Sequence, residues 1–101
     1  GGAMPPIQEK VGVGVYFAAS ANEPGTLIVK SIIKGSPAFK SNQISVGDTV
    51  LSVDGTSVAG KNLAGLADLL LGKQGTRVKL TFKSASVGGK YDVELDRGLN
   101  Q

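Results

Sequence analysis

The 101-residue sequence predicts a single α+β domain that is mostly β. We expect a small, mostly antiparallel barrel or sandwich of about five to six strands, capped by one long and one short helix. Three observations support this fold class. Short segments of alternating apolar residues recur, separated by Gly, Pro, Asn and Asp. Only one segment has leucines at helical spacing. The two predicted helices interrupt the strands rather than alternate with them, which argues against a doubly wound sheet.

The first part of the chain predicts two strands and the short helix. Apolar residues alternate over residues 11–19, which is the period of a strand. Residues 22–25 (Asn-Glu-Pro-Gly) are typical of a turn, and the β-branched segment 26–33 predicts a second strand. Ser36 followed by Pro37 is the order expected of an N-cap and the first residue of a helix, so the short helix should begin there.

The middle of the chain predicts two short strands and the long helix. Residues 49–53 and 56–58 flank Asp54-Gly55, a strong signal for a tight hairpin turn. Asn62 is a good N-cap for the helix, and Gly72 is expected to stop it. The residues predicted to share one helical face are Leu63, Leu66, Ala67 and Leu70.

Two last strands are predicted over residues 76–83 and 91–95, with a loop between them. Residues 1–4 (Gly-Gly-Ala-Met) are interpreted as a remnant of cloning, residues 5–98 as the domain and residues 99–101 as a tail. No apolar segment has the roughly 18 residues that a membrane span needs, and there is no signal peptide. We expect an excised domain that is monomeric in isolation.

The missing residue types exclude several kinds of chemistry. Without Cys there is no disulfide, thiolate nucleophile or Cys-based zinc site, and without His the commonest general base and metal ligand are absent. The eight acidic residues are scattered. We therefore expect no metal, no cofactor and no catalytic residues in this chain. The net charge of +3 comes from dispersed basic residues with few aromatics among them, so we expect no nucleic-acid partner.

Two glycine motifs do not support nucleotide binding. Residues 55–61 fit the first seven positions of a phosphate-binding loop, but Asn62 stands where Ser or Thr must hold magnesium. The Gly-Val-Gly of residues 12–14 would need its third fingerprint glycine at Phe17. Both are interpreted as parts of turns, strands and a helix cap.

An ordered set of motifs resembles the PDZ family over about residues 7–97. The motifs are residues 12–15 (Gly-Val-Gly-Val), 35–38 (Gly-Ser-Pro-Ala), 46–55 (Val-Gly-Asp-Thr-Val-Leu-Ser-Val-Asp-Gly) and, after the leucine-rich helix, 75–80 (Gly-Thr-Arg-Val-Lys-Leu). The first motif usually reads Gly-Leu-Gly-Phe in that family. The resemblance implies a partial antiparallel barrel that is not catalytic and binds C-terminal peptides between its second strand and main helix by β-strand addition.

One further motif is similar to a particular branch of that family. Residues 70–76 (Leu-Leu-Gly-Lys-Gln-Gly-Thr) resemble a run in the PDZ domains of carboxyl-terminal processing proteases. In that branch the strand next to the binding loop comes from the C-terminus, and residues 90–97 are suited to that place. Residues 6–10 can instead supply a short first strand in the usual order. The groove residues are the same in both cases.

The predicted carboxylate site is the glycine loop, because successive backbone amides can converge on one anion. The amides of Val13, Gly14 and Val15 are the expected donors, with Gly12 and Gly14 giving the loop its dihedral angles. Lys10 can add a charge directly or through water, although an ordinary exposed lysine would look the same. Gly14 is expected at a rim, so that Gly14→Val should abolish binding and leave the fold intact.

The predicted peptide groove has an apolar pocket for the terminal side chain. The residues expected to form it are Val13, Val15 and Phe17 of the strand with Ala67 and Leu70 of the helix. In the family, the residue after the helix cap reads the third peptide residue from the end, and Leu63 should favour an apolar residue there. Tyr16 and Ala18 should face other peptide side chains. The predicted groove residues are Tyr16, Phe17, Ala18, Leu63, Leu66, Ala67 and Leu70.

The expected partners are C-terminal tails of other proteins, with a membrane reached only through a partner or the parent protein. The main alternative is a regulatory, substrate-recognition PDZ domain of a carboxyl-terminal processing or high-temperature-requirement type serine protease, whose catalytic domain lies outside this chain. An enzyme fragment, and an architectural domain with a closed groove, are further alternatives. A cytoplasmic or organelle-associated location fits the main interpretation, and the periplasm or thylakoid lumen fits the protease alternative.

Overall fold

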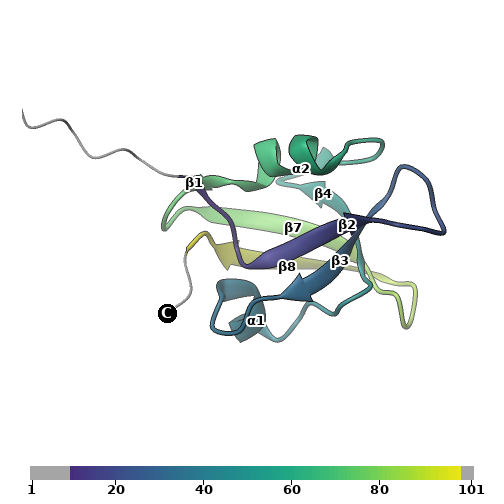
Figure 1. Ribbon diagram of the computed structural model, residues 1–101. Coiled ribbons are helices and arrows are strands. Elements are labelled where there is room, and N and C mark those ends of the chain that lie inside the picture. The colour runs from purple at the N-terminus through teal and green to yellow at the C-terminus, as the bar shows by residue number, and fades with distance from the viewer. Residues whose placement is uncertain (1–9, 99–101) are drawn as a thin grey trace, which may run out of the picture.

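The computed structural model describes residues 10–98 of the chain. Within these residues the chain forms eight strands and two helices (Figure 1). In chain order they are β1 (Lys10–Val11), β2 (Val15–Ala19), β3 (Leu27–Ile32), α1 (Pro37–Ser41), β4 (Thr49–Val53), β5 (Thr56–Ser57), α2 (Leu63–Leu70), β6 (Gly72–Lys73), β7 (Arg77–Lys83) and β8 (Lys90–Asp96). The predicted fold class, mostly β with one long and one short helix, is confirmed. Residues 1–4 and 99–101, interpreted as a cloning remnant and a tail, lie outside the described residues.

One antiparallel sheet forms the body of the domain, in the order β2-β3-β4-β7-β8, with β5 paired to β4. The β7–β8 hairpin is the longest pairing and runs in register from Arg77–Asp96 to Lys83–Lys90. Figure 1 shows α2 above the strands and α1 below them. Among the described residues β2 has one strand neighbour, so its other edge is unpaired, and α2 packs beside it.

The core is built by the inward residues of the strands and by two leucines of α2. Val78, Leu80 and Phe82 alternate along β7 and are at most 1% exposed, as their period of two predicts. Phe82 stacks on Tyr91 of β8 with ring centroids 5.4 Å apart. Leu66 is buried among these strand residues. α2 thus covers one side of the sheet, and the burial of its leucines holds the helix beside the edge strand.

The predicted turn and helix caps are confirmed. Asp54 and Gly55 both have positive φ, as a tight hairpin turn of this kind requires. The Asn62 side chain accepts a hydrogen bond from the Gly65 amide at 2.8 Å and so caps α2. Ser36 accepts one from the Phe39 amide at 3.2 Å, with Pro37 as the first residue of α1. These caps fix where both helices begin.

The prediction of one continuous strand over residues 11–19 is wrong. The chain leaves β1 after Val11 and enters β2 only at Val15, because Gly14 has a φ of 93°, which no strand residue adopts. β1 is a separate two-residue strand that pairs with β6. The alternation of apolar residues continues through the break, so periodicity alone does not show it.

The strand order follows the predicted arrangement in which the C-terminus supplies a strand of the sheet. Of residues 6–10, the alternative first strand, only Lys10 is among the described residues. β8 is the outer neighbour of β7, so the C-terminal strand takes the place beside the body of the sheet. β1 pairs only with β6, through Lys10–Lys73 and Val11–Gly72. The Gly98 amide donates to the Gly12 carbonyl at 2.9 Å, which brings the C-terminal segment to the glycine loop.

Asp48 of the central motif is a buried carboxylate that joins two distant turns. It is 3% exposed and accepts hydrogen bonds from the Tyr91 hydroxyl, the Ala85 amide and the Ser45 amide. Each carboxylate oxygen therefore has a donor, which is what allows the charge to be buried.

In the described part of the chain, neither helix has the length and apolar character to cross a membrane.

Candidate functional site

The unpaired edge of β2 and the helix α2 lie side by side, and the space between them is the candidate groove. In Figure 1 β2 and α2 run in opposite directions, so β2 begins near the point where α2 ends. At that end a Cβ on Gly12 would lie 3.2 Å from the Leu71 side chain, just beyond α2. At the other end Ala19 and Leu63 line the same hollow. The glycine loop therefore closes one end of the groove, and the start of α2 marks the other.

The carbonyls of the glycine loop are all held by the rest of the domain. The Gly12 carbonyl accepts from the Gly98 amide at 2.9 Å, and the Val13 carbonyl accepts from the Ala38 amide at 3.0 Å. The Gly14 carbonyl accepts from the Ile33 amide at 2.9 Å. Three elements, namely the C-terminal segment, α1 and the end of β3, thus fix the loop.

The orientation of the loop amides follows from these bonds. In a planar trans peptide the C=O and the next N–H point in opposite directions, and no described peptide bond is cis. The amides of Val13, Gly14 and Val15 therefore point away from the elements that hold the preceding carbonyls. Those of Val13 and Gly14 donate to no partner within residues 10–98. Because the carbonyls of the loop are bonded to the rest of the domain, the amides that follow them point away from it.

Gly14 is half-buried, and its surroundings argue against the expectation that Gly14→Val leaves the fold intact. Its φ of 93° is in the left-handed region. A Cβ there would overlap the Cβ and Oγ of Ser36, which is fully buried and caps α1. Gly12 is different, since its φ is outside that region. The dihedral argument thus applies to Gly14 alone, and a valine at this position should disrupt the fold.

The predicted groove residues divide into walls and core. Val15 and Phe17 of β2 are half-buried and pack on the core, and Ala67 of α2 is half-buried opposite them. Leu66 and Leu70 are 2% and 5% exposed and belong to the core. Val13, expected in the pocket, is 1% exposed and belongs to the core as well. A buried leucine can still form the floor of a pocket, but its side chain is not open to a ligand along its length.

The remaining predicted residues lie at the surface. Leu63, the first residue of α2, is 48% exposed and Tyr16 is 59% exposed, while Ala18 is half-buried. Lys10 is exposed on β1, next to the loop. An exposed leucine at the first helical position has no packing reason to be apolar, which makes Leu63 a candidate contact for a partner.

Arg97 is a residue of this region that sequence reasoning missed. Its Nε donates to the Leu70 carbonyl at 2.7 Å, and its Nη2 to the Leu69 carbonyl at 3.4 Å. Its Nη1 donates to the Thr76 hydroxyl at 3.1 Å. A Cβ on Gly72 would collide with the guanidinium, so this glycine makes room for it. Arg97 thus caps the end of α2 and positions one wall of the groove.

The described residues hold no cluster of metal-ligating side chains and no unpartnered buried side-chain polar atom. Within residues 10–98 no three acidic side chains lie close enough together to hold a metal ion. In the same part of the chain every buried polar side-chain atom has a hydrogen-bond partner. The groove is therefore a surface of backbone donors and apolar walls.

Comparisons with known proteins find a matching family model and sequence relatives. A family model described as PDZ domain matches residues 28–84. Carboxy-terminal processing protease CtpA of Bacillus subtilis is 41% identical over 73 residues, which cover 72% of this chain and 15% of CtpA. The chain thus spans less than a fifth of the length of this curated relative.

Two solved structures share the fold. The photosystem II D1 C-terminal processing protease superposes with a TM-score of 0.79 at 26% identity, over 88% of this chain and 23% of its own. The PDZ domain of a carboxy-terminal protease from Vibrio cholerae, solved in complex with a peptide, superposes with a TM-score of 0.75 at 26% identity. That match covers 87% of this chain and 93% of the Vibrio chain.

Proposed function

The chain belongs to the PDZ domain family, and from this premise we propose that it captures the free carboxyl terminus of other proteins in the groove between β2 and α2. The observation that carries the proposal is the glycine loop, whose carbonyls are bonded while the amides of Val13 and Gly14 donate to no partner within residues 10–98. This loop lies at the end of an unpaired strand edge. Together they suit an anion followed by an extended peptide.

The terminal carboxylate would accept hydrogen bonds from the amides of Val13, Gly14 and Val15. Bonds to a charged acceptor are stronger than neutral ones, and converging amides need no further cation. Lys10 is exposed on β1 beside the loop and would add a positive charge, directly or through water. The loop supplies the geometry, and Lys10 supplies attraction at longer range.

The rest of the peptide would pair with the free edge of β2 as an added antiparallel strand. Main-chain bonds give general affinity, and alternate side chains give choice. The terminal side chain would lie among Val15, Phe17 and Ala67, over a floor that includes Leu70. The third residue from the end would face Leu63, which offers apolar surface and no hydrogen-bonding group. Tyr16 and Ala18 would contact side chains on the opposite face of the peptide.

Amidation of the peptide tests the carboxylate site. A hexapeptide with apolar first and third residues from the end is compared with its C-terminal amide by fluorescence anisotropy. Loss of charge-assisted bonds costs about 1.5–3 kcal/mol, so the amide should bind roughly tenfold more weakly or worse. Equal affinity of the two forms would rule out this mechanism. A scrambled peptide of the same composition is the control for nonspecific binding.

A second function is favoured by the sequence relatives and the strand order. The chain is 41% identical to part of a carboxy-terminal processing protease, and its C-terminal strand β8 lies beside β7, as the sequence motif of residues 70–76 suggests for that branch. In such a protein the domain would hold the C-terminus of a substrate for a catalytic domain outside this chain. An unfolded carrier protein that ends in the same hexapeptide should then bind as tightly as the free peptide and stay uncleaved by the isolated domain.

A further inference from the structure

An open hollow of about 520 Å³ lies where β2 ends and α2 begins. It lies between the end of β2, the start of β3 and the residues that lead into α2, and Ala19, Leu27, Lys61 and Leu63 line it. The Gly60 amide donates to the Gly25 carbonyl at 3.2 Å, which ties the segment before α2 to the turn before β3. The hollow therefore has fixed walls, and it lies at the end of the candidate groove where α2 begins.

A peptide bound as proposed reaches this hollow with its fifth residue from the end. In an antiparallel pairing each step back along the peptide is one step forward along β2. With the terminal residue beside Val15, the third lies beside Phe17 and the fifth beside Ala19. Side chains alternate, so the first, third and fifth residues share the face toward α2. Ala19 lines the hollow, which places the fifth side chain there.

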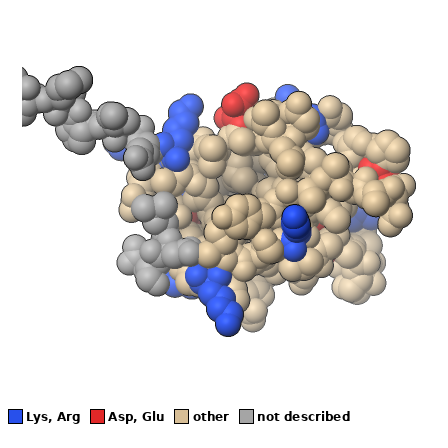
Figure 2. Space-filling model, viewed as in Figure 1, with Lys and Arg blue, Asp and Glu red and all other residues tan. Residues whose placement is uncertain are grey.

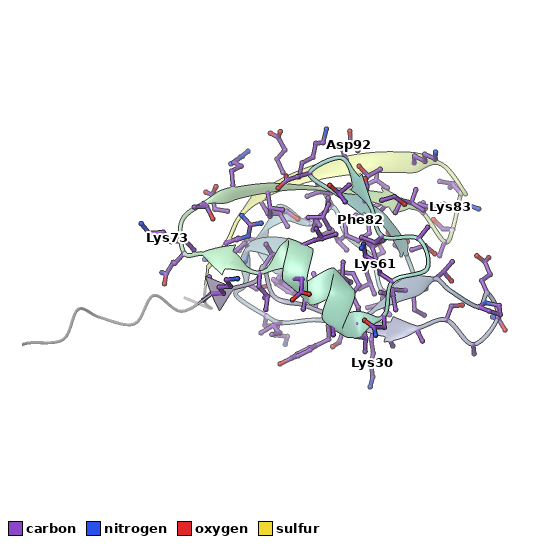
Figure 3. All side chains as sticks on the ribbon, turned by 90° about the horizontal axis from the view of Figure 1, so that it is seen from above. Lys30, Lys61, Lys73, Phe82, Lys83 and Asp92 are labelled. Carbon is purple, nitrogen blue, oxygen red and sulfur yellow. The ribbon has the colours of Figure 1, made fainter. Side chains whose placement is uncertain are left out.

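Lys61 is the one charged residue among the described residues that line the hollow, whereas Glu23 on the turn before β3 lines a neighbouring pocket. Lys61 is exposed on the wall of the hollow, and Lys30 is exposed on the neighbouring β3. Across residues 10–98 the ion pairs join Arg77 to Glu94 and Asp96, so neither lysine has a carboxylate partner there. Figure 3 shows Lys61 and Lys30 toward the end where α2 begins, with Asp92 on the opposite side of the molecule from Lys30. Figure 2 shows more basic than acidic side chains on the face that carries β2 and α2.

We propose that this hollow is a further peptide subsite that selects an acidic residue, Asp or Glu, at the fifth position from the ligand's end, with Lys61 as its specificity-determining residue. The proposal rests on the proposed function, because it needs a C-terminal peptide seated on β2. Lys61 attracts a carboxylate without displacing a partner of its own, and Ala19 and Leu63 accommodate the aliphatic part of the side chain. Lys30 adds to the positive potential.

Two hexapeptides that differ only in Glu or Lys at the fifth residue from the end test the subsite. The wild-type domain should bind the Glu peptide about fivefold more tightly, the upper range for one exposed charge pair. Lys61→Glu should reverse the order. Lys83→Glu makes the same change in net charge on β7, away from the hollow, and should keep the preference. The preference should shrink as salt rises from 0.05 to about 0.5 M.

The outcomes separate the subsite from the groove itself. If the peptides bind with a free carboxylate but with equal affinity, the subsite is overturned and the proposed function stands. If neither peptide binds better than its amide, the proposed function fails with it. A third outcome is that the domain binds vesicles of anionic phospholipid, that Lys61→Glu weakens this binding, and that the two peptides bind equally well. That result would assign the positive charge to a membrane surface and would also overturn the subsite.

Discussion

Replacing Gly14 by alanine tests the structural account of the glycine loop most directly. The substitution adds one methyl group at a position with a φ of 93°, where that methyl would overlap the buried side chain of Ser36. Ser36 cannot move away easily, because it is fully buried and its hydroxyl caps α1. The loop backbone or the start of α1 must therefore shift.

The magnitude is the sum of two costs. A non-glycine residue in the left-handed region costs roughly 1–2 kcal/mol, and an added carbon in a packed site costs about 1–3 kcal/mol. We expect a loss of about 2–5 kcal/mol, from a total that is typically about 5–15 kcal/mol for a domain. The melting temperature should fall by roughly 8 °C or more, at about 4–8 °C per kcal/mol for a domain of this size.

Two alanine variants separate these costs. Gly88 has a φ of 77° with no atom near its Cβ position, so Gly88→Ala measures the backbone cost alone. Gly12 has an ordinary φ and faces only the flexible end of Leu71 at 3.2 Å, so Gly12→Ala should cost less than about 1 kcal/mol. Urea denaturation should order the losses as Gly14, Gly88 and Gly12. A Gly14→Ala loss no larger than that of Gly88→Ala would refute the overlap with Ser36.

Three further predictions concern other parts of the domain. Burial, and the hydrogen bond and negative charge of Asp48, raise the pKa of the Tyr91 hydroxyl above its ordinary 10.0. The contribution of Tyr91 to the free energy of unfolding should therefore be constant below about pH 10 and fall as pH rises above it. Urea titrations should show Tyr91→Phe losing about 1–3 kcal/mol at pH 7 and losing this alkaline slope. Arg97→Ala should cost about 1.5–3 kcal/mol by calorimetry, since it leaves carbonyls at the end of α2 without their charged donor, and a wild-type melting curve would contradict its capping role. Leu63→His should cost less than about 1 kcal/mol because Leu63 is half exposed, and should reverse a preference for Val over Thr at the third peptide residue; an unchanged ranking in anisotropy titrations would show that Leu63 does not contact the ligand.

The fold could be predicted where local chemistry decides it. Asp54-Gly55 adopts positive φ at both residues, and Asn62 caps a helix that begins at the next residue. Periodicity identified β7, whose inward residues are almost fully buried. It failed over residues 11–19, because the alternation of valines continues across the glycine loop while the backbone does not. A hydrophobic pattern reports which side chains are inward, and a loop that packs on the core has inward side chains too.

The site was predictable only in part, for a similar reason. The helical period groups Leu63, Leu66 and Leu70 on one face, but the structure buries the last two and exposes the first. Spacing cannot separate a groove wall from the core beneath it, since both are apolar. Arg97 gives no local signal, because its partners at the end of α2 are more than twenty residues away. Gly72 offers a hint only once the guanidinium is known to occupy the space beside it.

Folding and the proposed ligand capture use opposite sides of the same three peptide groups. The carbonyls of Gly12, Val13 and Gly14 hold the loop to the C-terminal segment, α1 and β3, and planarity then directs the next amides the other way. Any variant that disturbs these carbonyls should weaken the fold and the anion site together. A change in the ligand, such as amidation, acts on the amides alone. Affinity for acid and amide peptides is therefore the measurement that isolates binding, whereas substitutions in the loop report mainly on stability.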